Sequence, residues 1–295
     1  MPELAAGIFA ERVGEWQVSG RRRSPDRPAA GDVPLIVALH GGSYTSAYFD
    51  LPGFSLLDRA ATAGIPILAL DRPCYGATTP LPPGAETILA SAERLDAMIG
   101  MLLAQSAEPA RPVVLVGHSI GAAITLAIAA RQPSWPLAGV AISGMCLASP
   151  PEAGAAWAAL PATVMIELPP DLKDAVMFGP AHTFGAPMPG LSHAADAPVP
   201  RAELLDIVLG WPTIAADILG KVRVPVHYRL AQHDRLWITN EGEVARFAVM
   251  LSEAPAVDAG LLRDTGHCTD FHHAGPALQT AQLEFALSCA APADR

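Results

Sequence analysis

The chain has 295 residues, a length that suits a single α/β domain carrying an insertion. Apolar residues make up 51% and charged residues 16%, so there is material for a large core and the composition excludes a disordered protein. The formal net charge of −10 offers no basic surface for nucleic acid or for an anionic membrane. We therefore expect neither as a partner.

The N-terminus and the cysteines favour a cytoplasmic location. Residues 1–4 contain no basic segment, and Glu11 falls where a signal peptide would stay apolar. No apolar run approaches the roughly 18 residues that a membrane span needs. The four cysteines show no C-x-x-C spacing and are typical of a reduced compartment. They are Cys74, Cys146, Cys268 and Cys289.

Four short apolar runs, each followed by turn residues, are predicted as buried strands. They cover residues 34–39, 65–70, 112–116 and 139–142. Their hydrophobicity is continuous rather than alternating, which indicates a parallel sheet covered on both faces. Helical patterns cover residues 88–103 and 122–131. This rhythm predicts a doubly wound, mostly parallel α/β sheet. The basic run 21–23 is predicted in a solvated turn between two earlier strands.

The rhythm breaks after residue 151. Strands are predicted again at 224–230 and 258–262, followed by a closing helix at 274–287. We predict an α/β core of residues 1–151 and 223–295, with residues 152–222 inserted as a mostly helical cap or lid. Seven apolar residues of the insertion are equally compatible with lining a pocket and with forming its own core. They are Met165, Met177, Phe178, Phe184, Met188, Leu191 and Trp211.

Ser119 is the candidate nucleophile, at the centre of Gly117-His118-Ser119-Ile120-Gly121. A G-x-S-x-G match carries meaning when a buried strand precedes it and a helix follows. Small residues two positions away on either side leave room for a sharp turn, and the helix amides point toward developing negative charge. The alternative is an ordinary turn in which the serine caps the helix.

A serine hydroxyl needs a base within hydrogen-bond reach. His267 is the preferred base because it follows the last predicted strand, whereas His118 adjoins the serine on a tight turn. His272 and His273 are interpreted as surface or packing residues. Asp234, just past strand 224–230, is the acid that orients the imidazole, and the order Ser119, Asp234, His267 suits this fold. Asp206 and Asp217 compete only if the insertion folds inward.

Residues 40–43, His-Gly-Gly-Ser, follow the first predicted core strand, where a second amide donor for an oxyanion is needed. Glycine lets the backbone approach a substrate closely. The expected oxyanion hole is formed by the amides of Gly42 and Ile120, with Ser43 as a substitute for Gly42. His40 is expected to support the loop by hydrogen bonding.

Together these motifs resemble the α/β-hydrolase superfamily over nearly the whole chain. Residues 71–76, Asp-Arg-Pro-Cys-Tyr-Gly, are similar to the family's D-x-x-G-x-G loop, with Cys74 in place of a glycine. The resemblance implies an esterase, lipase, thioesterase, lactonase or amidase that needs no cofactor. A minority of relatives are peroxidases, lyases or cyclases, and some are non-catalytic.

The expected function is hydrolysis of an ester-like bond, in a carboxylic ester, thioester or lactone, of a mid-sized hydrophobic small molecule. The alternatives are a cofactor-free non-hydrolytic relative, such as a peroxidase, lyase or cyclase acting on a natural product, and a non-catalytic binding module. No cofactor is expected. His267, Asp270, His272 and His273 do not have zinc-site spacing, and no phosphate-binding glycine motif is present. A homodimer is left open.

Overall fold

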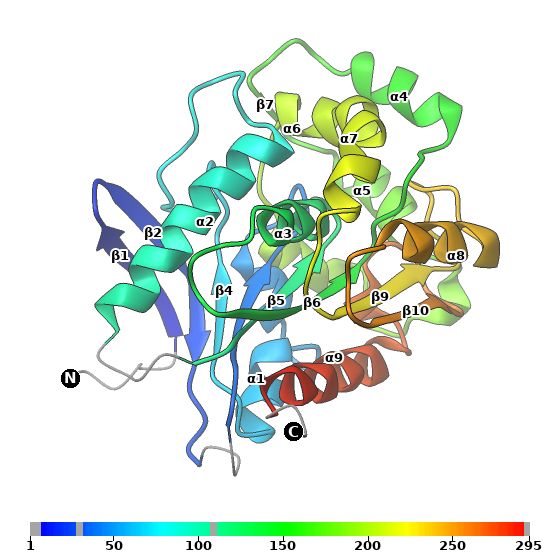
Figure 1. The fold of residues 1–295 in the computed structure, drawn as a ribbon. Helices are drawn as coiled ribbons and strands as arrows, with labels where there is room; N and C mark the ends of the chain where they lie inside the picture. Colours follow the sequence, from blue (N-terminus) through cyan, green and yellow to red (C-terminus); the bar gives the residue numbers. More distant parts are fainter. Residues whose placement is uncertain (1–6, 28–31, 107–110, 292–295) are drawn as a thin grey trace.

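The computed structural model describes residues 7–27, 32–106 and 111–291 (Figure 1). Residues 1–4, considered above for targeting, lie outside these ranges. Within the described ranges, no helix is both long and apolar enough to cross a membrane.

Eight strands form one sheet in the order β1-β2-β4-β3-β5-β6-β9-β10. Every neighbouring pair is parallel except β1 with β2 and β2 with β4. The predicted doubly wound, mostly parallel sheet is therefore confirmed. The strands are β1 (Gly7–Val13), β2 (Trp16–Arg23), β3 (Leu35–Leu39), β4 (Ile67–Leu70), β5 (Val113–His118), β6 (Leu137–Ser143), β9 (Val226–Ala231) and β10 (Val257–Leu262).

Helices cover both faces of the sheet, which explains the continuous apolar runs of its central strands (Figure 1). One face packs against α2 (Ile88–Gln105), α3 (Ile120–Ala130) and α8 (Glu241–Met250). The other packs against α1 (Leu56–Thr62) and α9 (Gly275–Ala290). Short 3-10 turns are η1 (Ser46–Asp50), η2 (Ala181–Thr183), η3 (Gly190–Ala195) and η5 (Thr269–Phe271).

The basic run 21–23 lies in strand β2, so its prediction as a turn is wrong. The arginines are accommodated there because acidic and aromatic side chains lie within reach. Arg21 pairs with Asp50 at 3.2 Å, and Arg22 pairs with Glu11 at 2.5 Å. The Arg22 guanidinium also lies over the Phe9 ring, 5.1 Å from its centroid.

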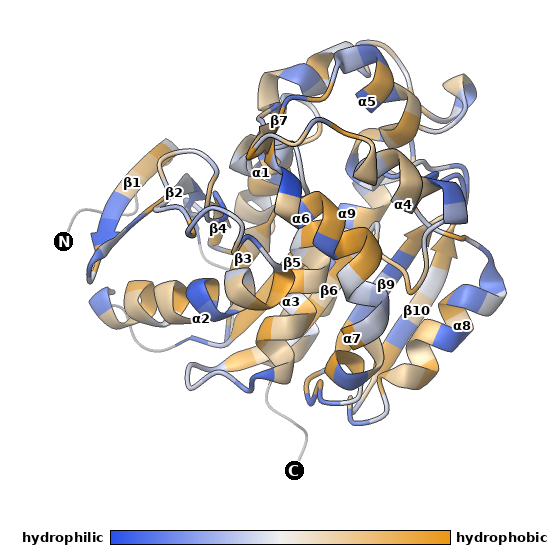
Figure 2. Cartoon of the chain, turned by 90° about the horizontal axis from the view of Figure 1, so that it is seen from above, coloured by the Kyte–Doolittle hydropathy of each residue, from blue (hydrophilic) through white to orange (hydrophobic). Residues whose placement is uncertain are grey.

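Between β6 and β9 the chain forms short helices above the carboxyl ends of the central strands (Figure 2). Helix α7 (Trp211–Leu219) packs on α3, and the Trp211 indole donates a hydrogen bond to the Cys146 carbonyl at 2.9 Å. The elements are α4 (Pro151–Ala158), β7 (Met165–Ile166), α5 (Pro170–Met177), β8 (Val199–Pro200), α6 (Arg201–Leu205), a π-helical turn (Asp206–Gly210) and α7 (Trp211–Leu219). Among the strands of the described residues, β7 and β8 pair only with each other. Below, we keep the name insertion for residues 152–222, the range predicted from the sequence.

Candidate active site

Ser119 lies on the turn between β5 and α3 with φ 56° and ψ −124°. A non-glycine residue in this backbone region is strained, and such strain is often found at functional sites. A side chain at Gly121 would overlap the carbonyl groups of Leu39 and His40, so only glycine lets the helix approach strand β3 this closely. The Ser119 hydroxyl makes no helix-capping hydrogen bond, so the structure does not support the alternative in which this serine caps the helix.

The structure brings Ser119, His267 and Asp234 together although they are far apart in sequence. The Ser119 hydroxyl lies 2.8 Å from Nε2 of His267, and Nδ1 of His267 lies 2.7 Å from a carboxylate oxygen of Asp234. The second oxygen of Asp234 accepts the Leu236 amide at 2.9 Å. A carboxylate accepts hydrogen bonds and does not donate them. Nδ1 of His267 therefore carries the proton, and Nε2 of His267 is left to accept a hydrogen bond from the Ser119 hydroxyl.

The rival residues make other contacts. Nδ1 of His118 lies 3.1 Å from the Ser143 hydroxyl, and its ring stacks on Tyr48. Asp206 accepts the Ile88 amide, and Asp217 pairs with Lys221 on the surface.

His272 anchors the loop that carries His267. Its Nε2 accepts the amides of Gly266 at 3.0 Å and Gly179 at 3.2 Å, while Nδ1 donates to the Cys268 carbonyl at 2.9 Å. Burial lowers the pKa of His272 to about 4, so the ring is neutral near pH 7. Its interpretation as a packing residue is consistent with this position, whereas its neighbour His273 is exposed.

Gly42 and Ile120 both line the pocket above Ser119. Among the described residues, neither amide has a hydrogen-bond acceptor. A Cβ on Gly41 would lie 2.9 Å from the Ser119 Cβ, so the loop after β3 passes directly beside the serine. Both amides are therefore available as hydrogen-bond donors beside the pocket.

His40 supports the loop after β3 by hydrogen bonding. Its Nδ1 donates to the Gly41 carbonyl at 2.8 Å, and its Nε2 accepts the Arg72 amide at 3.1 Å. Burial, with a further contribution from the Arg72 charge, lowers the pKa of His40 to about 3. The neutral ring therefore serves as a hydrogen-bonding bridge, as expected from the sequence.

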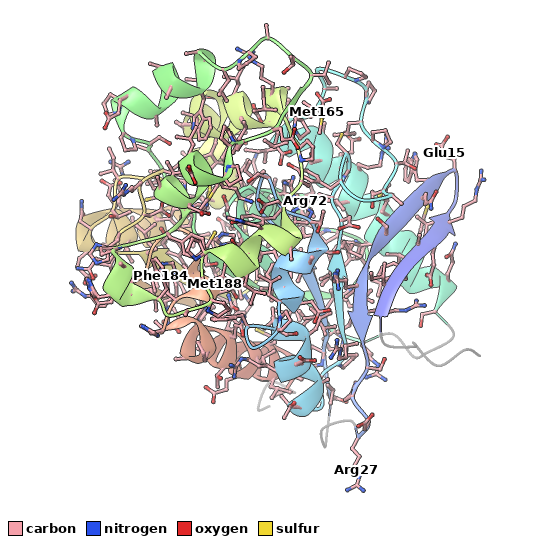
Figure 3. All side chains as sticks on the ribbon, turned by 180° about the vertical axis from the view of Figure 1, so that it is seen from behind. Glu15, Arg27, Arg72, Met165, Phe184 and Met188 are labelled. Carbon is pink, nitrogen blue, oxygen red and sulfur yellow. The ribbon has the colours of Figure 1, made fainter. Side chains whose placement is uncertain are left out.

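Arg72 joins the same loop to the insertion. Its guanidinium is fully buried and donates to the carbonyls of His40 at 2.8 Å and Gly41 at 3.1 Å. It also forms an ion pair with Glu203 of α6, whose other oxygen accepts the Tyr75 hydroxyl at 3.0 Å. Burial raises the pKa of Glu203, and the Arg72 charge opposes that shift. Figure 3 shows Arg72 in the interior, in contrast to Arg27 and Glu15 at the periphery.

A second buried cation reaches the loop from α5. The Lys173 ammonium forms an ion pair with Asp196, donates to the Ser43 carbonyl at 3.1 Å, and lies 3.4 Å from the centroid of the Tyr44 ring. Its burial lowers the pKa, and Asp196 opposes the shift. The sequence analysis identified neither Lys173 nor Glu203, since a charged residue in a short helix ordinarily faces solvent.

The space not filled by atoms in the pocket above Ser119, open solvent at its mouth included, is about 460 Å³. Its walls carry no ionisable side chain, which suits a neutral, largely apolar group. Of the seven apolar insertion residues named above, Met177 lines it, while Met165 is partly exposed at 36%. Its lining residues are Gly42, Ser43, Ser119, Ile120, Ser149, Trp157, Leu168, Met177, Leu204, Ile207, Val208, Leu236 and Trp237.

Two cysteines, Cys74 and Cys268, lie in loops that the sequence motifs include. Cys74 stands where the family pattern has glycine, and its φ of 76° is the left-handed conformation that explains the usual glycine. Cys268 follows His267 and is fully buried, and burial raises its pKa to about 12. That pKa keeps the thiol protonated and packed rather than reactive. Within the described residues, no group of three or more His, Cys, Asp and Glu side chains is arranged to hold a metal ion.

The fold and the serine turn at the end of β5 define the class of the protein. The sequence model of the alpha/beta hydrolase family matches residues 36–282. The chain therefore belongs to the alpha/beta hydrolase family, and the enzyme is an α/β-hydrolase. No curated protein matches the sequence.

Solved structures share the fold at low sequence identity. A soluble variant of monoglyceride lipase from Saccharomyces cerevisiae aligns with a TM-score of 0.71 and 13% identity, covering 98% of each chain. An esterase from Thermogutta terrifontis aligns with a TM-score of 0.65 and 17% identity, covering 97% of this chain and 98% of that one. The thioesterase domain from the curacin pathway gives 0.63 and 16%, covering 95% and 99%.

Proposed function

We propose that the protein is a serine hydrolase that cleaves an ester-like bond of a neutral, mid-sized hydrophobic substrate through an acyl-enzyme. The observation that carries the proposal is the pair of short contacts from Ser119 to His267 and from His267 to Asp234, at 2.8 and 2.7 Å. Such a relay lets a serine hydroxyl lose its proton as it attacks a carbonyl.

In the proposed reaction, the Ser119 oxygen attacks the carbonyl carbon and its proton moves to Nε2 of His267. The negative charge that develops on the carbonyl oxygen is held by the amides of Gly42 and Ile120. His267 then gives the proton to the leaving alcohol or thiol, and an acyl-Ser119 remains. Water, deprotonated by His267, then attacks the acyl carbon. The bond from that carbon to the Ser119 oxygen breaks, the acid is released, and His267 returns the proton to Ser119. Asp234 fixes the imidazole tautomer and stabilises its charged form throughout.

The pocket and the solved structures with the same fold support the choice of substrate class. Its uncharged lining favours an apolar acyl or alcohol group, and esterase, lipase and thioesterase activities are named for the similar structures. We therefore propose carboxylic esters, thioesters or lactones as substrates, and residues 152–222 as the cap that covers them.

The test is a panel of p-nitrophenyl esters, acyl thioesters and lactones of graded chain length, combined with labelling by a fluorophosphonate. The wild-type enzyme should show a burst of acyl-enzyme and should be labelled, and Ser119→Ala should lose both. Turnover that persists in Ser119→Ala would refute the proposal. Labelling without any hydrolysis would favour a non-hydrolytic reaction, and absence of labelling would favour a binding module.

A further inference from the structure

Ser43 has two unusual features, a left-handed backbone conformation and a buried hydroxyl without a partner among the described residues. It follows Gly42 in the loop after β3 and has φ 60°, in the left-handed region that serine rarely occupies. The residue is only 2% exposed, yet its hydroxyl has no hydrogen-bond partner among the described residues. Buried hydroxyl groups are normally paired, so an unpaired one next to a reactive serine calls for an explanation.

The backbone of Ser43 is held firmly while its side chain is left free. Its carbonyl accepts hydrogen bonds from the Lys173 ammonium and from the Ala197 amide, both at 3.1 Å and both from the insertion. The neighbouring residue Tyr44 forms an antiparallel bridge with Asp196. These contacts at the Ser43 carbonyl and at the next residue hold the backbone in place, and they use the carbonyl but not the hydroxyl.

Ser43 borders the pocket together with Ser119, Gly42 and Ile120. Most of the remaining wall is apolar and offers the hydroxyl no acceptor. An acceptor supplied by a bound substrate would satisfy it. Because Ser43 directly follows Gly42, the acceptor closest at hand is the carbonyl oxygen that receives the Gly42 amide.

We propose that the Ser43 hydroxyl is a third oxyanion donor, which hydrogen-bonds to the substrate carbonyl oxygen as that oxygen becomes negative. The inference rests on the serine-hydrolase function proposed above. The reaction steps are unchanged, and the hydroxyl keeps its proton throughout. Ser43 is then a catalytic residue in addition to Ser119, His267 and Asp234.

The experiment compares Ser43→Ala and Ser43→Gly with the wild type on the best p-nitrophenyl ester. Both variants should lower kcat by about 10- to 100-fold with little change in KM, because an oxyanion donor acts mainly in the transition state. Affinity for a trifluoromethyl ketone, which forms an anionic adduct with Ser119, should fall by a similar factor. Affinity for the matching amide, which stays neutral, should not change.

Two controls separate chemistry from folding. Thr125→Val removes another buried hydroxyl without a partner, one that does not border the pocket, and should keep kcat within about twofold of wild type. Ser43→Gly relieves the backbone strain, so it should remain folded even where Ser43→Ala does not.

The outcomes are distinguishable. Wild-type kcat in the glycine variant would overturn the inference, and so would equal losses for the ketone and the amide, which indicate a ground-state contact. If the wild-type enzyme itself neither hydrolyses esters nor reacts with the fluorophosphonate, the proposed function fails, and the inference about Ser43 fails with it.

Discussion

Glu203 and Arg72 form a fully buried ion pair that links helix α6 of the insertion to the loop after strand β4. The same guanidinium holds the carbonyls of His40 and Gly41, directly beside Ser119. The Arg72 side chain thus contacts both the insertion and the candidate oxyanion loop.

Breaking this pair should destabilise the protein strongly. Glu203→Leu leaves the Arg72 charge buried without its partner, so we expect a loss of about 3–5 kcal/mol in the free energy of unfolding. The double variant Arg72→Met with Glu203→Leu should recover part of that loss, because no charge remains buried. Urea unfolding of all three variants measures the effect.

The matched control is the exposed pair of Lys221 and Asp217, four residues apart on α7 and the turn that follows it. Lys221→Met should cost no more than about 0.5 kcal/mol. Equal losses for Glu203→Leu and Lys221→Met would contradict the importance assigned to the buried pair.

The sequence predicts the fold because its signals are local. Continuous apolar runs become β3, β4, β5 and β6, and the helical periodicity of residues 88–103 becomes α2. The candidate triad can also be predicted, because each member lies in the loop after a strand whose carboxyl end is fixed by the parallel sheet. Such positions are set by chain order alone.

The residues that sequence analysis missed depend on contacts across the fold. Glu203 and Lys173 lie in short helices where charged residues usually face water, and only tertiary packing buries them. The pocket lining was only partly predicted for the same reason. The run 21–23 was misassigned because three consecutive arginines suggest solvent rather than a strand, and their acidic partners lie far away in sequence.

Asp234→Asn should lower kcat by about 10³- to 10⁴-fold with little change in KM. The amide would donate where the carboxylate accepts, so His267 would present the wrong tautomer to Ser119. Steady-state kinetics on an activated ester provide the measurement. Asp264→Asn, at an exposed position near the same loop, serves as the control and should behave like the wild type. Unchanged kcat in Asp234→Asn would remove Asp234 from the proposed triad.

The π-helical turn 206–210 offers a matched pair of substitutions that test the pocket. Ile207 is buried and lines the pocket, whereas Leu209 on the same turn is 55% exposed. Ile207→Trp should shorten the pocket and shift the preferred p-nitrophenyl ester by several carbons toward shorter chains, through KM. Leu209→Trp should leave the chain-length profile unchanged. The same shift in both variants would indicate a general disturbance of the insertion instead of a shorter pocket.

Acid should destabilise the protein through buried neutral histidines. His272 has a pKa of about 4 when folded and about 6.5 when unfolded, so between these values only the unfolded state binds the proton. Stability is therefore retained above pH 6.5 and is lost as the pH falls toward 4. His40, with a pKa of about 3, and His227, with a pKa of about 4, act in the same direction. The raised pKa values of Glu203 and Asp270 act in the opposite direction.

His272→Gln isolates one contribution, because glutamine keeps a donor and an acceptor but does not titrate. Between pH 6.5 and 4.5, its free energy of unfolding should fall less steeply than that of the wild type, by about 1 kcal/mol per pH unit, close to the one-proton value of about 1.4. Urea unfolding curves at half-unit pH intervals supply the comparison. Parallel pH profiles for the two proteins would show that the folded His272 ring is already protonated or is not buried. The role of His272 in anchoring the loop that carries His267 would then be wrong.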